Sequence, residues 1–102
     1  MTDRPFQIVA EALASSIAAK TGFVEVEGEA LAVVARDLAS VFRGGGRLLL
    51  FGNGGSAADA QHIACEFVVR MRRERKPIAA TALTTDTSIL TAIPNDYSFE
   101  RL

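Results

Sequence analysis

A glycine-rich turn between a short apolar run and a helical segment is the feature that most constrains the fold of this chain. Residues 48–66 read LLLFGNGGSAADAQHIACE. An apolar run bounded by turn signals predicts a buried parallel strand at 47–51. Three glycines within 52–55 permit a tight turn, and Ser56 is predicted to cap a helix from 57 to about 72.

Two helices are predicted ahead of this strand. Apolar residues recur at helical spacing over 5–20 and again over 29–43. Gly22 interrupts the pattern, because glycine is a poor helix former, and the consecutive glycines at 44–46 end the second helix. The segment at about 5–43 is therefore predicted to be a helical hairpin.

A second strand and a short helix are predicted after the glycine-rich turn and its helix. The strand is expected at 78–83 and the helix at 88–93, before Pro94. The order strand, helix, strand within about 47–93 indicates a βαβ unit with a parallel sheet, and hence an α/β fold. Because two strands make a very small sheet, we expect residues 1–102 to be the N-terminal part of a single larger domain.

Composition narrows the class of protein. The chain has 102 residues, 49% of them hydrophobic, and a formal net charge of −1. That charge gives no general attraction to nucleic acid or to an anionic membrane, and no apolar run approaches the ~20 residues of a membrane span. The start lacks the apolar core of a signal peptide, and the single cysteine, Cys65, cannot form an internal disulfide. We expect a cytoplasmic protein with no membrane and no nucleic-acid partner.

The glycine-rich turn lies where open α/β sheets bind ligands, after a strand and before a helix. Backbone N–H groups and the helix dipole favour an anion there, and Asn53 and Ser56 add hydrogen-bonding side chains. Gly52, Gly54 and Ala57 also have the spacing of a dinucleotide-binding turn, but no acidic residue follows at the expected distance, and no P-loop lysine follows the glycines. A cradle for a phosphate or a sugar is favoured over a tight turn that binds nothing.

The predicted helix after the turn carries His62 and Glu66, four residues apart and so on one face. An imidazole and a carboxylate at this spacing can reach one metal ion, or Glu66 could act as a general base beside a bound sugar. A surface ion pair is the alternative. A zinc site needs three or four ligands, and Asp59 and Gln61 do not align with the pair. Cys65 points elsewhere on the helix and is predicted to be a small buried residue.

Basic residues gather after this helix. Five of the eleven Lys and Arg residues lie within 70–76, at the predicted C-terminal end of the helix. Cations complement the helix dipole at that end. No aromatic residue is interleaved with them, so a solvated helix end is favoured over a nucleic-acid site.

The block from Gly52 to His62, with Glu66 after it, resembles the sugar isomerase (SIS) domain, and within it the phosphoheptose isomerase family. The segments 82–88 and 95–97 are also similar to that family. The resemblance implies a three-layer αβα sandwich with a parallel sheet. It also implies a homotetramer that assembles through the N-terminal helices.

The reaction implied by this resemblance is the conversion of sedoheptulose 7-phosphate to glycero-manno-heptose 7-phosphate, which supplies the heptose of bacterial lipopolysaccharide. The resemblance implies zinc ligands at His62 and Glu66, with Glu66 also the proton-transfer base. The substrate-binding residues that it implies are Asn53, Gly54, Gly55, Ser56, Glu66, Asn95 and Asp96.

The family's second half has a serine-rich phosphate loop, followed by a Gln and a His that complete the metal site. None of these is present in the 102 residues, so we expect a fragment that is inactive alone. One alternative is a noncatalytic, partner-binding SIS protein of the replication-initiator-associating type, whose members lack an acid at the position of Glu66. Another is a sugar-phosphate-sensing domain, which is usually attached to a DNA-binding module, and nothing here resembles such a module.

Overall fold

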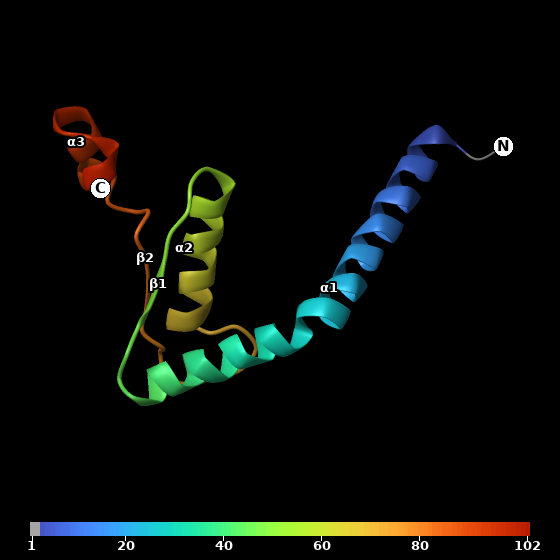
Figure 1. The fold of residues 1–102 in the computed structure, drawn as a ribbon, viewed down its shortest axis with the longest axis horizontal. Coiled ribbons are helices and arrows are strands. Elements are labelled where there is room, and N and C mark those ends of the chain that lie inside the picture. Colours follow the sequence, from blue (N-terminus) through green and yellow to red (C-terminus); the bar gives the residue numbers. More distant parts are fainter. Residues whose placement is uncertain (1–2) are drawn as a thin grey trace. The chain divides into compact units, whose positions relative to one another are not determined.

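The computed structural model describes residues 3–102 (Figure 1). Contacts divide the chain into two compact units, one up to Ala39 and one from Ser40 to Leu102. Helices and strands alternate from the first strand onward, as expected of an α/β protein. In chain order the elements are α1 (Arg4–Arg43), β1 (Leu48–Leu50), α2 (Gly55–Val68), β2 (Ala80–Ala82), α3 (Thr87–Asp96) and the 3-10 helix η1 (Phe99–Arg101).

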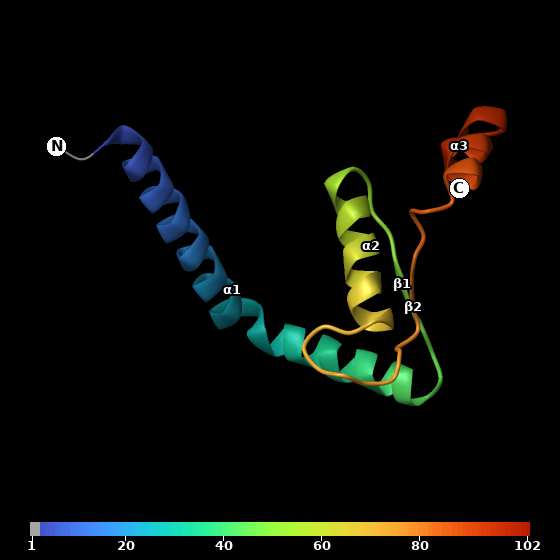
Figure 2. The same ribbon diagram turned by 180° about the vertical axis from the view of Figure 1, so that it is seen from behind.

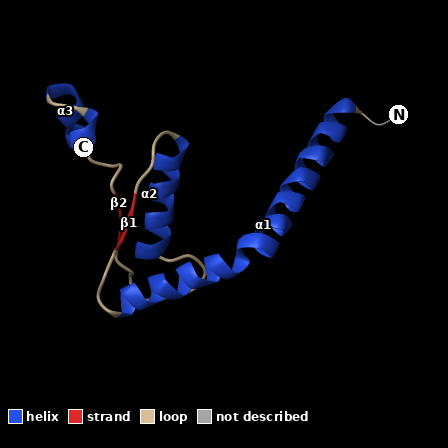
Figure 3. Cartoon of the chain, viewed as in Figure 1, coloured by secondary structure: helices blue, strands red, loops and turns tan. Residues whose placement is uncertain are grey.

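The N-terminal segment is a continuous helix of 40 residues, and the predicted break at Gly22, which would make a hairpin, is wrong. Figure 3 shows α1 as helix throughout. An isolated glycine lowers helix stability by only about 1 kcal/mol relative to alanine, and helical residues flank Gly22 on both sides. Within residues 3–102, no helix is both long enough and apolar enough to cross a membrane.

The predicted glycine stop at 44–46 does end α1. Gly45 adopts a φ of 81°, a left-handed conformation that glycine accepts without steric cost. The N–H of Gly45 donates to the Phe42 carbonyl at 3.1 Å, and the N–H of Gly46 donates to the Val41 carbonyl at 2.9 Å. This pair of bonds is a Schellman cap, which satisfies two of the last carbonyls of the helix.

The two strands pair in parallel, which confirms the predicted sheet. Each strand is shorter than the predicted ranges 47–51 and 78–83. The first ends early because the chain turns away into the glycines. The second starts late because the N–H of Ile78 donates to the Phe67 carbonyl of α2, at 3.1 Å. The register pairs Leu48 with Ala80, Leu49 with Thr81 and Leu50 with Ala82.

The packed centre of the second unit is built from small side chains. α2 lies against β1 and β2, as Figure 1 and, from behind, Figure 2 show. Ala60 and Ala64 share one face of α2 and are 4% and 8% exposed, and Ala82 of β2 is 8% exposed. Alanine side chains at the contact let the helix backbone approach the strands closely. Cys65 is exposed, so its predicted burial is wrong; it follows Ala64 and projects about 100° around the helix from the packed face.

The last α-helix extends beyond its predicted end at Ile93 and contains Pro94. A proline inside a helix removes one backbone hydrogen bond. The helix nevertheless continues past it, and the N–H of Tyr97 donates to the Ile93 carbonyl at 3.0 Å. The start of α3 is capped by Asp86, whose side chain accepts a hydrogen bond from the N–H of Ile89 at 3.0 Å.

The cap at Asp86 gives a stability prediction. Asp86→Ala should lower the free energy of unfolding by about 1 kcal/mol, because the N–H of Ile89 loses its acceptor. Asp86→Asn keeps an acceptor oxygen and should stay close to the unsubstituted protein. Urea unfolding measures both, and equal loss in the two variants would show that charge, rather than the cap, is what matters.

Candidate functional site

The glycine-rich turn is closed by its own backbone. Gly54 has φ 55° and ψ −123° and occupies the N-cap position of α2, which begins at Gly55. The N–H of Ser56 donates to the Asn53 carbonyl at 3.0 Å. The prediction that Ser56 caps the helix is therefore wrong, because the turn already brings the chain into helical geometry before it, and no side chain makes a cap bond.

Gly52 is required by a close approach within the turn. A Cβ atom at this position would lie 2.7 Å from the Cβ of Ser56 and 2.9 Å from its carbonyl carbon. Real Cβ atoms essentially never come this close to other heavy atoms, so any larger residue would displace the start of α2. The close packing of the turn against the start of α2 therefore requires glycine at position 52.

A hollow opens at the carboxyl ends of the two strands, where parallel sheets commonly bind ligands. The turn after β1 contributes Asn53 and Gly54 to its lining. The segment after β2 contributes Thr84, Thr85 and Asp86. The two strand ends therefore form one concave surface, with polar groups at the two turns and a mainly apolar lining beside them that includes Phe51 and Leu90.

Thr84 joins this second segment to α2. Its hydroxyl accepts a hydrogen bond from Gln61 Nε2 and donates one to the Ala57 carbonyl, each at 3.4 Å. Thr84, Thr85 and Asp86 were not among the predicted site residues. Their position directly after the second strand was the signal that could have found them, because the carboxyl ends of parallel strands share one edge.

His62 and Glu66 form a pair on one face of α2, as their spacing predicts. His62 Nε2 lies 3.3 Å from Glu66 Oε1. The His62 side chain is 78% exposed and that of Glu66 is 32% exposed. Neither residue lines the hollow at the strand ends. The pair lies on α2, farther along the helix from the glycine-rich turn than the part of α2 that lines the hollow.

The geometry of this pair can be compared with the demands of a zinc ion. Two ligands at zinc's usual bond lengths and tetrahedral angle are about 3.4 Å apart, close to the observed separation. An ion pair has the same separation, so the distance fits both interpretations. Among residues 3–102 no cluster of three or more His, Cys, Asp or Glu side chains could hold a metal. The pair can supply two zinc ligands, and the others would have to come from elsewhere.

A family model of the SIS domain matches residues 10–101, which is most of the chain. The chain belongs to the SIS-domain family. Phosphoheptose isomerase of Roseiflexus sp. (strain RS-1) is 55% identical to this SIS chain over 94 residues, which are 92% of the chain and 48% of the relative. The chain thus spans about half the length of the curated relatives it matches.

Solved structures confirm the SIS fold. Phosphoheptose isomerase GmhA from Neisseria gonorrhoeae aligns with a TM-score of 0.79 at 43% identity, covering 93% of this chain and 48% of that one. A phosphoheptose isomerase from Francisella tularensis aligns with a TM-score of 0.83 at 34% identity, covering 99% and 52%. The predicted α/β class and the resemblance to phosphoheptose isomerases are both confirmed.

Asn95 and Asp96 lie at the end of α3 in this SIS chain. Both are exposed, and Asn95 Nδ2 donates to Asp96 Oδ1 at 3.0 Å. The part of α3 that lines the hollow is its first half, through Ile89 and Leu90. The structure does not bring Asn95 and Asp96 to the glycine turn, and their role in substrate binding stays a prediction.

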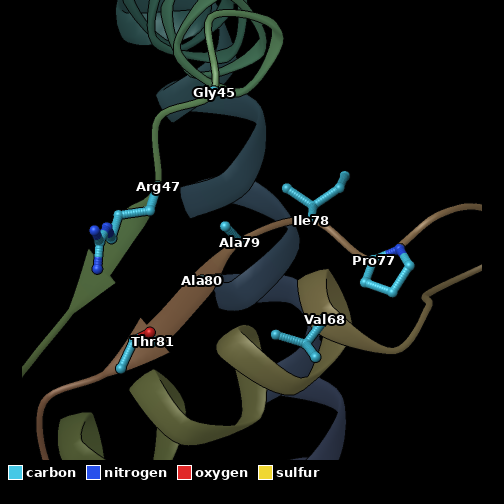
Figure 4. Close-up of a pocket in the computed structure, with 8 residues that line it drawn as sticks. All are labelled: Gly45, Arg47, Val68, Pro77, Ile78, Ala79, Ala80 and Thr81. Atoms are coloured by element: carbon cyan, nitrogen blue, oxygen red, sulfur yellow. The ribbon is translucent and has the colours of Figure 1, made fainter.

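A second hollow of the SIS chain lies at the opposite, amino ends of the strands (Figure 4). Its lining includes Val68, Pro77 and Ile78, and Figure 4 shows the Arg47 side chain lying apart from these three. The lining includes no acid, histidine or cysteine that could catalyse a reaction. The hollow at the carboxyl ends is therefore the better candidate site.

Proposed function

We propose that this chain forms part of the active site of an aldose–ketose isomerase that converts sedoheptulose 7-phosphate to glycero-manno-heptose 7-phosphate. The observation that carries the proposal is the His62–Glu66 pair, with its 3.3 Å separation, on the helix that begins at the glycine-rich turn. The names of the curated relatives support the same reaction class.

The chemistry requires a group that moves a proton between neighbouring carbons. In the proposed reaction the Glu66 carboxylate takes a proton from C1 of the ketose, which leaves an enediolate. The carboxyl proton can exchange with solvent before a proton is delivered to C2, and a hydroxyl proton passes from O1 to O2, so that the carbonyl ends on C1. A carboxylate held beside the substrate is suited to this general acid–base work.

The glycine-rich turn would hold the sugar phosphate. Gly54 and Gly55 are at the start of α2, the positive end of the helix dipole, where an anion is favoured. Asn53 lines the hollow and can hydrogen-bond to a sugar hydroxyl. Ser56 lies in the first turn of α2, exposed, and would add a further donor.

The homotetramer is a proposal supported by the apolar side chains on α1. Phe6, Val9, Leu13 and Ile17 lie at helical spacing and are 58–65% exposed within the chain. An apolar stripe of this kind suits contact with another copy of the helix.

A cytoplasmic location is also proposed, because the single cysteine, Cys65, forms no internal disulfide.

Zinc is the proposed cofactor, with His62 and Glu66 as two of its ligands. The chemistry that zinc supplies when bound is polarisation of a carbonyl oxygen.

We expect chelator-treated protein to lose turnover and to regain it with added zinc. His62→Ala should lower the zinc content measured by elemental analysis, whereas Asp37→Asn on α1 should not. Full zinc content in the His62 variant would remove His62 from the ligand set.

Turnover of sedoheptulose 7-phosphate tests the proposed function. The protein as its gene encodes it should form the aldose phosphate, as followed by NMR. Residues 1–102 alone should not, because within residues 3–102 there are only two of the ligands that a zinc site needs. Binding of the sugar phosphate by folded, zinc-loaded protein without any conversion would instead support a binding or sensing role.

A further inference from the structure

We propose that Arg75 is a positioning residue for Glu66, because its guanidinium caps the last turn of α2, from which Glu66 projects. The inference rests on the proposed function, since it assigns Arg75 a part in placing the base. Arg75 lies in the loop between α2 and β2. It neither lines the hollow at the carboxyl ends of the strands nor belongs to the proposed zinc ligands.

Three hydrogen bonds place the Arg75 guanidinium. Nη2 donates to the Glu66 carbonyl at 2.6 Å, and Nη1 donates to the Phe67 carbonyl at 2.8 Å. Nη1 also donates to the carbonyl of the next residue, Lys76, at 3.2 Å. The Arg75 residue is partly buried, which keeps these bonds from full competition with water. A planar guanidinium suits two adjacent carbonyls better than any other side chain does.

The carbonyls at the end of a helix otherwise lack partners. In α2 the Cys65 carbonyl accepts from the N–H of Val69 at 2.8 Å, and the Phe67 carbonyl also accepts from the N–H of Ile78. The Glu66 carbonyl, which lies between these two in the sequence, accepts its hydrogen bond from the Arg75 guanidinium. The last turn of α2 has no basic residue of its own, so Arg75 is also the cation that its dipole favours.

The consequence for the site is mechanical. Glu66 is the third residue from the end of α2, where an uncapped helix frays. Its carboxylate meets His62 one turn earlier, at 3.3 Å, and this separation depends on the last turn staying helical. Fraying would move the carboxylate away from both the imidazole and the substrate.

The other basic residues of the loop do not share this position. Arg70 pairs with Glu74 on the surface, where the two side chains are 57% and 85% exposed. Such exposed pairs contribute little. Arg73 is exposed and makes no side-chain hydrogen bond within residues 3–102. Arg73 is therefore a matched control of the same residue type in the same loop.

The test is steady-state kinetics on the full protein with sedoheptulose 7-phosphate. Arg75→Met should lower kcat by about 10- to 100-fold, the loss that misplacing a reacting group brings, and leave KM within about twofold. Arg75→Lys keeps the charge but replaces the two nitrogens that reach the two carbonyls with one, so its kcat should lie between the two. Arg73→Met should match the unsubstituted protein. Hydrogen exchange should show faster amides at the end of α2 in the Arg75 variants alone.

The outcomes separate this inference from the proposed function. Normal kcat in folded Arg75→Met overturns the positioning role, even if its thermal stability falls. If the Met variant does not fold, normal kcat in Arg75→Lys overturns it in the same way. Absence of turnover in the unsubstituted protein overturns the proposed function, and the positioning role with it. Hydrogen exchange would then still show whether Arg75 caps the helix.

Discussion

Replacing Glu66 with glutamine should lower kcat for sedoheptulose 7-phosphate by about 10²- to 10⁴-fold, the usual contribution of a general base. Glutamine has nearly the size of glutamate and keeps an oxygen that His62 can meet, so α2 should remain folded. It cannot accept the proton from C1. Stopped or continuous NMR of the product measures the loss, and circular dichroism checks the fold.

Glu74→Gln is the matched control for this variant. Glu74 is also an acid that forms a pair four residues away, with Arg70, but its side chain is 85% exposed and lies beyond the end of α2. It should leave kcat and KM unchanged. If Glu66→Gln and Glu74→Gln had equal activity, Glu66 would have no place in the mechanism.

Gly52→Ala should destabilise the protein by about 1–3 kcal/mol, the usual cost of forcing extra atoms into a packed site. The added methyl group would meet Ser56 at 2.7–3.0 Å, including backbone atoms that cannot swing aside. Relief requires movement of the turn or of the start of α2, so the affinity for the sugar phosphate should fall as well. Urea unfolding and calorimetric titration with substrate measure the two effects.

Gly55→Ala provides the contrast within the same turn. No atom lies within 4 Å of a Cβ built at Gly55, and its φ is not in the left-handed region. Because alanine favours helix over glycine, this variant should be equally stable or more stable by up to about 1 kcal/mol. Similar destabilisation in both variants would show that the close approach at Gly52 is not the cause.

Local patterns were sufficient to predict the elements around the glycine-rich turn. The apolar run predicts a strand, the three glycines a turn, and the residues after them a helix. The parallel pairing follows because a helix connects the two strands. The break at Gly22 was wrong because one glycine weighs little against a long helix. The burial of Cys65 was wrong because a helix of fourteen residues presents more faces than the two strands can cover.

Part of the candidate site could likewise be predicted from the sequence, and part could not. The facing of His62 and Glu66 follows from the period of a helix and was predictable from spacing alone. Arg75 and Thr84 make their contacts through the return of the chain, across 8 to 27 residues, which spacing on one helix cannot show. Their roles emerge only when α2 and the two strand ends are placed together.

The most direct test of the proposed isomerase is conversion of sedoheptulose 7-phosphate in D₂O by the protein as its gene encodes it. Proton transfer through an enediol predicts an aldose phosphate that carries deuterium at C2. Exchange with solvent is open to the Glu66 carboxylate, since its side chain is 32% exposed. NMR should therefore show deuterium at C2 of the product, and Glu66→Gln should form almost none of it. Product free of deuterium would show that the proton on Glu66 does not exchange with solvent before it is delivered, whereas unchanged substrate with folded, zinc-loaded protein would contradict the proposed isomerase.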